Sequence, residues 1–210
     1  MWSMLAFAIG VMAGARPVRA AETRYELDEA HSRVTIQVGK AGLFGFAGHE
    51  HEVVTGALRG SITADPTQLA SAHVALAFEA AALRVTGKGE PAGDVPKVQA
   101  AMVGPKCLDA ARFPLIEFAS TGVSVDRTTA GAADLTVRGR LMLHGVTREI
   151  RVPLHLDFGT TGAGTFTATG KTTLKQTDYG IEPITVAGVV KVKDEIALTW
   201  MMRGRPPTGK

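Results

Sequence analysis

The polar residues with the most suggestive spacing lie together in the segment GHEHE, residues 48–52. His49 and His51 are two positions apart, so on a β-strand both imidazole rings lie on one face, where they can share a metal ion. His31 is a candidate third ligand from a neighbouring strand. The sequence offers no cysteine partner and no third histidine at ligand spacing. A polar start of a strand is therefore the other interpretation of the segment.

The sequence contains few combinations of residues that could catalyse a reaction. It contains no Gly-x-Ser-x-Gly motif, no glycine-rich phosphate loop and no paired carboxylates at a plausible active site. Ser32 directly follows His31, and adjacent residues of a strand face opposite ways, so the two do not form a dyad. His73 and His155 alternate out of phase with the apolar residues and are predicted to face solvent, and His144 is predicted to lie in a turn. The sequence therefore predicts a protein that is not an enzyme.

The segment from Lys40 to Gly48 combines apolar side chains with glycine. It places Leu43, Phe44 and Phe46 among three glycines. An exposed apolar loop lowers solubility unless something covers it. Two interpretations stay open: a hydrophobic plug that closes one end of the fold, or a mobile lid over a ligand.

Alternating apolar residues predict the strands that position these groups. In residues 146–158 the apolar side chains fall on the even positions, with Arg148 as the one exception. Residues 135–143 alternate in the same way, and His144-Gly145 between the two segments has the chemistry of a hairpin turn. Two adjacent strands with one apolar face each predict an antiparallel sheet that buries this face.

Similar alternation recurs along the rest of the chain. The further predicted strands lie near residues 33–38, 58–63, 73–79, 116–119, 166–174 and 190–200. About eight strands separated by turn residues are typical of an antiparallel barrel or sandwich. The one interval without alternation is 94–111, where Pro96 and the apolar residues after it predict a short helix that ends at Gly104-Pro105.

Composition limits the partners of the chain. The 210 residues have a net charge of +3 with basic and acidic residues intermixed, so no nucleic-acid partner is predicted. The single cysteine, Cys107, rules out an internal disulfide. It is predicted to be a buried small apolar residue, with a free thiol as the alternative.

Both ends of the chain are predicted to lie outside the fold. Residues 1–20 hold a short apolar run that ends in small residues, which is the pattern of a secretory signal peptide cleaved after Ala20. No basic residue precedes this run, which leaves an uncleaved anchor as the alternative. Residues 21–203 are predicted to form one domain, and residues 204–210 a disordered tail.

Four segments resemble motifs of the YceI-like family. YELDEAHSRV at residues 25–34 resembles the opening Y-x-L-D-x-x-H-S-x-V, and LDAARFPLIEF at residues 108–118 resembles the segment D-x-x-x-F/Y-P-x-I-x-F. GRLMLHGVTR at residues 139–148 resembles the hairpin G-x-L-T-I-x-G-V-T-R/K, and DYGI at residues 178–181 fits the turn D-F/Y-G. The motifs follow the family order over nearly the whole predicted domain.

The resemblance implies an all-β fold, an antiparallel eight-stranded lipocalin-like barrel, in a secreted or periplasmic protein. It also implies a polyisoprenoid or similar amphiphilic lipid inside the barrel, with no catalysis and no cofactor besides this lipid. A barrel of about eight strands is either filled by its own side chains or holds one small ligand. The expected partners are the lipid, a membrane in transient contact and, as an option, a second copy of the chain.

The glycine-rich loop departs from the usual family pattern, which leaves the identity of the lipid open. Bulky groups at inward or mouth positions of the expected barrel are predicted to line the ligand site. These residues are Leu43, Phe44, Phe46, Phe78, Phe118 and Phe166. His49 and His51 are predicted to bind a polar headgroup, and a metal-binding barrel that uses both histidines is the alternative function.

Overall fold

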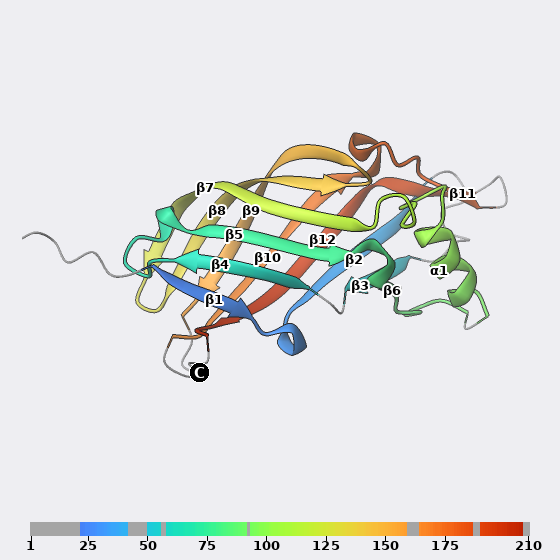
Figure 1. The fold of residues 1–210 in the computed structure, drawn as a ribbon. Helices are drawn as coiled ribbons and strands as arrows, with labels where there is room; N and C mark the ends of the chain where they lie inside the picture. Colours follow the sequence, from blue (N-terminus) through green and yellow to red (C-terminus); the bar gives the residue numbers. More distant parts are fainter. Residues whose placement is uncertain are drawn as a thin grey trace, which may run out of the picture.

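The computed structural model describes residues 22–41, 50–55, 58–91, 93–158, 164–186 and 190–207. This part of the chain consists mainly of antiparallel strands, with one α-helix at one end (Figure 1). The strands are β1 (Thr23–Leu27), β2 (Arg33–Ala41), β3 (His51–Thr55), β4 (Arg59–Ala64), β5 (His73–Glu79), β6 (Leu83–Val85), β7 (Leu115–Thr129), β8 (Ala132–Leu143), β9 (Val146–Asp157), β10 (Phe166–Lys175), β11 (Thr185–Val186) and β12 (Val190–Arg205). The helices are α1 (Val95–Val103) and the short 3-10 helices η1 (Glu29–His31), η3 (Leu69–Ser71), η4 (Ala80–Ala82) and η5 (Gln176–Tyr179).

Eight strands close into a barrel. Their order is β1-β4-β5-β7-β8-β9-β10-β12, and the end of β12 pairs back with β1, which places Glu26 opposite Arg205 and Leu27 opposite Gly204. Every neighbouring pair in this ring is antiparallel. The predicted eight-stranded antiparallel barrel is confirmed.

Three further strands extend the wall toward α1. β12 pairs with β2, β2 with β3 and β3 with β6. A side chain of α1 covers the free edge of β6: Gln99 Oε1 accepts a hydrogen bond from the Val85 N–H at 2.9 Å, and Gln99 Nε2 donates one to the Leu83 carbonyl at 3.0 Å. The amide side chain thus satisfies backbone groups that a free strand edge exposes.

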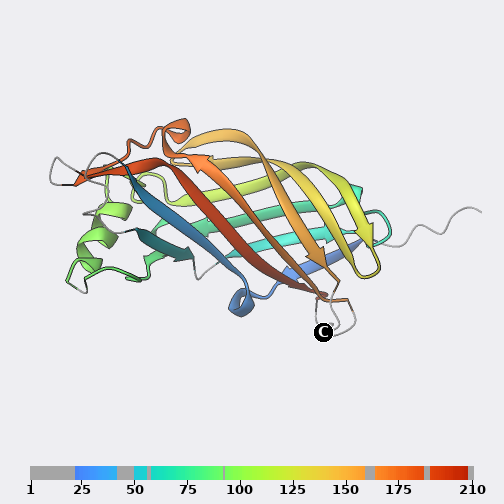
Figure 2. The same ribbon diagram turned by 180° about the vertical axis from the view of Figure 1, so that it is seen from behind.

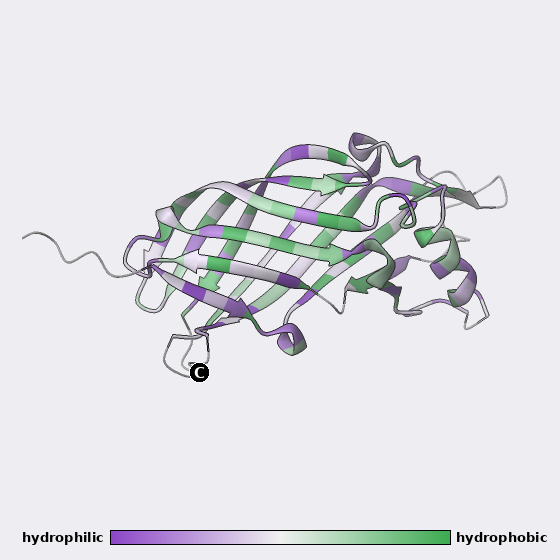
Figure 3. Ribbon diagram, in the orientation of Figure 1, coloured by the Kyte–Doolittle hydropathy of each residue, from purple (hydrophilic) through white to green (hydrophobic). Residues whose placement is uncertain are grey.

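Side chains alternate between the two faces of the wall, as the sequence predicts. Along β8 the odd positions from Ala133 to Leu143 are buried, and the even positions between them are not. Figure 3 shows the same alternation of hydrophobic and hydrophilic residues on neighbouring strands. Burial of apolar side chains on the inner face stabilises the fold by about 25 cal/mol per Å² of surface removed from water. The alternation therefore determines which face points inward.

The predicted hairpin and helix are both present. His144 and Gly145 have φ angles of 52° and 73°, the left-handed conformation that a two-residue type I′ turn requires. α1 ends at Val103, and its C-cap is Gly104, where the sequence predicts the end of a helix. The helix and the segment after it lie at the end of the barrel that also holds β6 (Figure 1).

β12 extends beyond the predicted domain boundary. Gly204 is buried opposite Leu27, and Arg205 pairs with Glu26. Because these two residues close the barrel, the prediction that a disordered tail begins at residue 204 is wrong for them. The predicted signal peptide, residues 1–20, and residues 208–210 lie outside the described residues. None of the described helices is long and apolar enough to cross a membrane.

Candidate ligand-binding site

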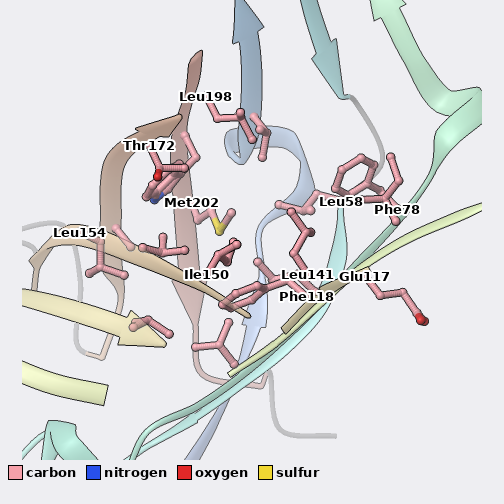
Figure 4. Close-up of a pocket in the computed structure, with 18 of the residues that line it drawn as sticks. Leu58, Phe78, Glu117, Phe118, Leu141, Ile150, Leu154, Thr172, Leu198 and Met202 are labelled. Atoms are coloured by element: carbon pink, nitrogen blue, oxygen red, sulfur yellow. The ribbon is translucent and has the colours of Figure 1, made fainter. Parts of the chain in front are cut away.

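The interior of the barrel contains an apolar cavity of about 270 Å³ (Figure 4). Buried apolar residues form one cluster toward each end of the barrel, and the cavity lining draws on both clusters. The polar residues of this lining are Glu117, Thr172 and Gln176. Glu117 is exposed and points away from the apolar side chains (Figure 4). The barrel is therefore hollow, and its inner surface is almost entirely hydrocarbon.

Many lining side chains point inward yet are only half buried. Ile150 and Val152 of β9 and Leu198 and Trp200 of β12 belong to this class. In a close-packed core, inward aliphatic side chains leave almost no free space. Here the remaining exposure faces the cavity, so apolar surface stays available to a ligand.

Three of the predicted lining residues are part of the cavity wall. Phe78 of β5, Phe118 of β7 and Phe166 of β10 all line the cavity. Phe166 is buried and packs edge-on against Tyr25, with ring centroids 5.1 Å apart, whereas Phe78 and Phe118 are half buried. Contact of these rings with a ligand stays a prediction.

A glycine makes room for one of these rings. Gly139 is an inward position of β8, and a methyl group there would overlap the ring of Phe118 and lie 2.7 Å from the Ala119 carbonyl oxygen. The absence of a side chain at Gly139 thus lets Phe118 lie over the backbone of β8. A glycine on β8 is therefore needed for the aromatic ring of β7 to keep this position.

Four other predicted site residues, Leu43, Phe44, Phe46 and His49, lie outside the described residues. Their roles as lid, plug or headgroup contact stay predictions.

His51 binds a buried carboxylate at the start of β3. Its Nδ1 lies 2.9 Å from Glu90 Oε1, and the Glu90 side chain is only 1% exposed. The second oxygen, Glu90 Oε2, has no hydrogen-bond partner among the described residues. His51 itself is not one of the residues that line the cavity. The predicted contact of His51 with a headgroup stays a prediction, and it would involve the other ring nitrogen, Nε2.

His31 does not join His51. It lies in η1, at the other end of β2, and its side chain is 62% exposed, with Nδ1 2.8 Å from Asp28 Oδ2. The suggestion that His31 supplies a third metal ligand is wrong. Within the described ranges, no three His, Cys, Asp or Glu side chains converge as a metal site. The metal-binding alternative thus rests on His49, which the structure does not describe.

Burial raises the pKa of two titratable side chains in this part of the barrel. Cys107 lines the cavity beside the cluster near α1, and burial raises the pKa of its thiol. The thiol therefore stays protonated, in keeping with the predicted small apolar role. Burial also raises the pKa of Tyr179, whose hydroxyl finds no hydrogen-bond partner in the described part of the chain.

Most of the residues that line the cavity were not predicted from the sequence. The predicted lining residues were mainly aromatic, whereas most of the wall is aliphatic and also includes Trp200 and Met202 of β12. Figure 4 shows Ile150 and Leu198 around the same space. Every second residue of each strand points inward, and this alternation would have identified the missing lining residues.

Comparison with known proteins identifies the family. The model of the YceI-like domain matches residues 25–203. The chain belongs to the YceI-like family. No curated protein matches it in sequence.

Solved structures share the fold of this YceI-like protein. BcnA from Burkholderia cenocepacia superposes with a TM-score of 0.65 at 18% identity, covering 84% of this chain and 98% of its own. A polyisoprenoid binding domain from Saccharophagus degradans, implicated in plant cell wall breakdown, gives 0.63 at 14% identity, covering 87% and 98%. The YCEI protein of Campylobacter jejuni gives 0.54 at 13% identity, covering 75% and 85%. At these identities the likeness shows the fold alone.

Three segments that resemble YceI-like motifs meet at the end of the barrel near α1. Phe113 packs edge-on against His144, with ring centroids 4.5 Å apart. His144 Nδ1 lies 3.1 Å from the Tyr179 carbonyl oxygen, and the following residue, Gly180, has a φ of 71°. None of these four residues is among those that line the cavity. These four residues therefore join structural elements at this end, whereas other residues of the same motifs, such as Phe118, Leu141 and Ile181, line the cavity.

Proposed function

We propose that this YceI-like protein binds an amphiphilic lipid, a polyisoprenoid or similar long-chain molecule, in the barrel cavity and carries or sequesters it without catalysis. The observation that supports this proposal best is the apolar lining of the 270 Å³ cavity. A hydrocarbon chain needs few directional contacts, so a wall with few polar groups suits this class of ligand. A structure with the same fold is that of a polyisoprenoid binding domain.

The binding energy would come from burial of hydrocarbon. Each methylene removed from water contributes about 0.8 kcal/mol. About ten buried methylenes would contribute about 8 kcal/mol, from which the cost of immobilising the lipid is subtracted. The half-buried lining residues gain as well, because a bound chain covers the surface that they now expose.

The volume of the cavity limits how much of the lipid it holds. An engineered cavity of about 150 Å³ binds benzene, and ligand pockets commonly span about 300–1,000 Å³. The 270 Å³ found here therefore suits a segment of a hydrocarbon chain. We expect the headgroup and part of a long polyisoprenoid to lie outside the cavity.

The proposed contacts follow from the placement of the predicted residues. Phe78, Phe118 and Phe166 would contact the tail, because all three line the cavity. His51 would meet a headgroup through Nε2, since Nδ1 is held by Glu90.

The compartment and the partners are part of the same proposal. Residues 1–20 have the pattern of a secretory signal, which supports a location in the periplasm or outside the cell. An exported lipid carrier must exchange its ligand with a membrane, so transient membrane contact is included. Self-association into a homodimer is the remaining partner proposal, and size-exclusion chromatography with light scattering tests it.

Lipid analysis of the natively purified protein tests the proposal directly. Native mass spectrometry is expected to show a bound lipid that organic extraction releases. Leu198→Trp, which fills the cavity from β12, is expected to abolish the bound species. Ala197→Trp is the matched control, because Ala197 is the exposed neighbour on the same strand.

Two results would contradict lipid binding. One is a wild-type protein that carries no lipid and takes up none from added geranylgeraniol. The other is an equal loss of lipid in both tryptophan variants, which would show that the cavity side of β12 has no special role. Circular dichroism of both variants establishes that the barrel is intact.

A further inference from the structure

The wall of the barrel lacks backbone pairing over part of the boundary between β9 and β10. The two strands pair only over residues 154–157 and 167–170. β9 nevertheless runs along β8 from its first residue, and β10 runs along β12 to its last. Residues 146–153 and 171–175 therefore lack the ladder that would join them, and Figure 2 shows the strands diverging toward η5. We call this stretch without a ladder the β9–β10 slot.

Pro153 stands where the two strands part. A Cβ atom on Gly170 would lie 2.5 Å from the Pro153 carbonyl oxygen, so this carbonyl faces β10. In an antiparallel ladder the N–H and C=O groups of one residue point to the same side. Proline has no N–H to donate. The ladder therefore loses a hydrogen bond on the β10 side at Pro153, and the slot begins there.

The slot borders the cavity. Side chains from both of its edges line the cavity, namely Ile150, Val152, Thr172 and Leu174. The first three of these are only half buried. At the far end of the slot, Arg148 Nε donates a hydrogen bond to the Asp178 carbonyl oxygen at 2.9 Å, which links β9 to η5. The slot is thus a bounded stretch without backbone pairing, and apolar side chains from both of its edges face the cavity.

Cationic side chains surround the slot on the outer face. Arg151 of β9 lies directly opposite Arg138 of β8, and both are exposed. Like charges directly opposite each other destabilise a sheet. Neither arginine forms an ion pair with a carboxylate in the described part of the chain. An external anion would relieve this repulsion.

Two more cations extend this group. Lys171 is exposed on β10, next to the last paired residue. Arg148 is also exposed and lies at the far end of the slot, but it occupies an even position of β9 and binds the Asp178 carbonyl oxygen. We call Arg138, Arg148, Arg151 and Lys171 the slot cations. The exposed acids Glu149 and Asp178 lie nearby and offset only part of this charge.

We propose that the slot cations seat the β9–β10 slot on an anionic membrane surface, and that the lipid passes sideways through the slot between membrane and cavity. The proposal rests on the proposed lipid-binding function. Basic side chains close to an anionic bilayer each strengthen binding by about fivefold. With the slot against the bilayer, an apolar tail moves from hydrocarbon to the apolar cavity edge without crossing water.

Vesicle binding tests the docking surface. The protein is expected to sediment with vesicles of phosphatidylcholine and phosphatidylglycerol and not with phosphatidylcholine alone. Arg138→Ser combined with Arg151→Ser should weaken binding by about 30-fold, at about fivefold per arginine. Arg24→Ser combined with Arg59→Ser is the control, because it removes the same charge from exposed positions on β1 and β4.

Cross-linking tests the slot as the route. In a Cys107→Ala background, Glu149→Cys and Thr173→Cys place thiols at exposed positions on the two edges of the slot. Bridging them with a bismaleimide should slow the transfer of dansyl-labelled geranylgeraniol from anionic vesicles at least tenfold, whereas each single-cysteine variant transfers normally. Pro153→Val, which restores an N–H facing β10, should slow transfer in the same direction without a cross-link.

Several outcomes overturn the proposal. These are equal vesicle binding by the two double-serine variants, no preference of the wild type for anionic vesicles, tighter binding of a nucleic-acid fragment than of the vesicles, or unchanged transfer after cross-linking. Native mass spectrometry separates such a failure from a failure of the proposed function. A protein that still carries lipid but does not dock binds its ligand by another route, whereas a protein without lipid fails at the earlier step.

Discussion

β8 and β9 are adjacent strands with the same alternation, yet their inner faces differ. The inward residues of β8 are buried, with Leu135 only 5% exposed, while Ile150, Val152 and Leu154 of β9 are half buried. β8 is paired on both sides along its length, whereas β9 has β10 beside it over only part of its length. Alternation thus decides which side chains point inward, and the neighbouring strands decide how closely they pack.

The largest expected effect comes from one substitution made on both strands. Leu135 and Leu154 lie directly opposite each other on the inner face. Leu135→Ala should lower the free energy of unfolding by about 3–4 kcal/mol, because it leaves a hole among buried neighbours. Leu154→Ala should lower it by about 1–2 kcal/mol, because it only widens a space that is already open. Urea denaturation of lipid-free protein measures both values.

Equal losses from the two substitutions would contradict the comparison, since they would mean that β9 packs as tightly as β8. Repeating the measurement with bound lipid tests the difference between the two strands more strictly. A ligand that fills the cavity should raise the cost of Leu154→Ala more than that of Leu135→Ala, because Leu154 lines the cavity from the more open strand.

A smaller difference is expected four pairs further along the hairpin. Gly139 of β8 faces Ile150 of β9. Gly139→Ala should cost about 1–3 kcal/mol, because the new methyl group must displace the ring of Phe118. Ile150→Val should cost about 0.5 kcal/mol, because the lost methyl group faces the cavity. Thermal unfolding of the two variants shows which substitution destabilises the protein more. If Gly139→Ala destabilises it less than Ile150→Val, the ring of Phe118 moves freely.

The parts of the fold that depend on local sequence were predictable. The inward positions of β8 and β9 follow from a period of two, which holds whatever the strands pack against. The turn at His144-Gly145 and the end of α1 at Gly104 follow from conformational preferences of single residues. These features need no knowledge of distant contacts.

The hollow interior and the unpaired stretch between β9 and β10 were not predictable from alternation. A filled barrel and a hollow one have the same pattern, so only the family resemblance implied a cavity. Pro153 is visible in the sequence, but its effect depends on whether its missing N–H faces β8 or β10. The partner of His51 is Glu90, 39 residues along the chain, and no local pattern joins the two.

The smallest effect concerns η5, which contacts β9 where β10 no longer does. Asp194 of β12 anchors η5: its Oδ1 accepts a hydrogen bond from the Thr177 N–H at 2.9 Å, and its Oδ2 accepts one from the Thr177 hydroxyl at 2.8 Å. These bonds, that from the backbone N–H first, hold the pKa of Asp194 below its usual value of 3.8. A carboxyl group with a lowered folded pKa adds stability above its unfolded pKa and loses it as pH falls through the folded value.

Asp194→Asn should therefore lower Tm at neutral pH, and the gap from wild type should shrink as pH falls below 3.8. The control is Asp126→Asn, which makes the same change of charge on β7, where Asp126 accepts a hydrogen bond from Thr136. Differential scanning calorimetry across this pH range measures both variants. A gap that stays constant with pH would mean that the charge of Asp194 does not hold η5. The closure of the wall beside β9 would then depend on the Arg148 hydrogen bond to η5 and on apolar packing.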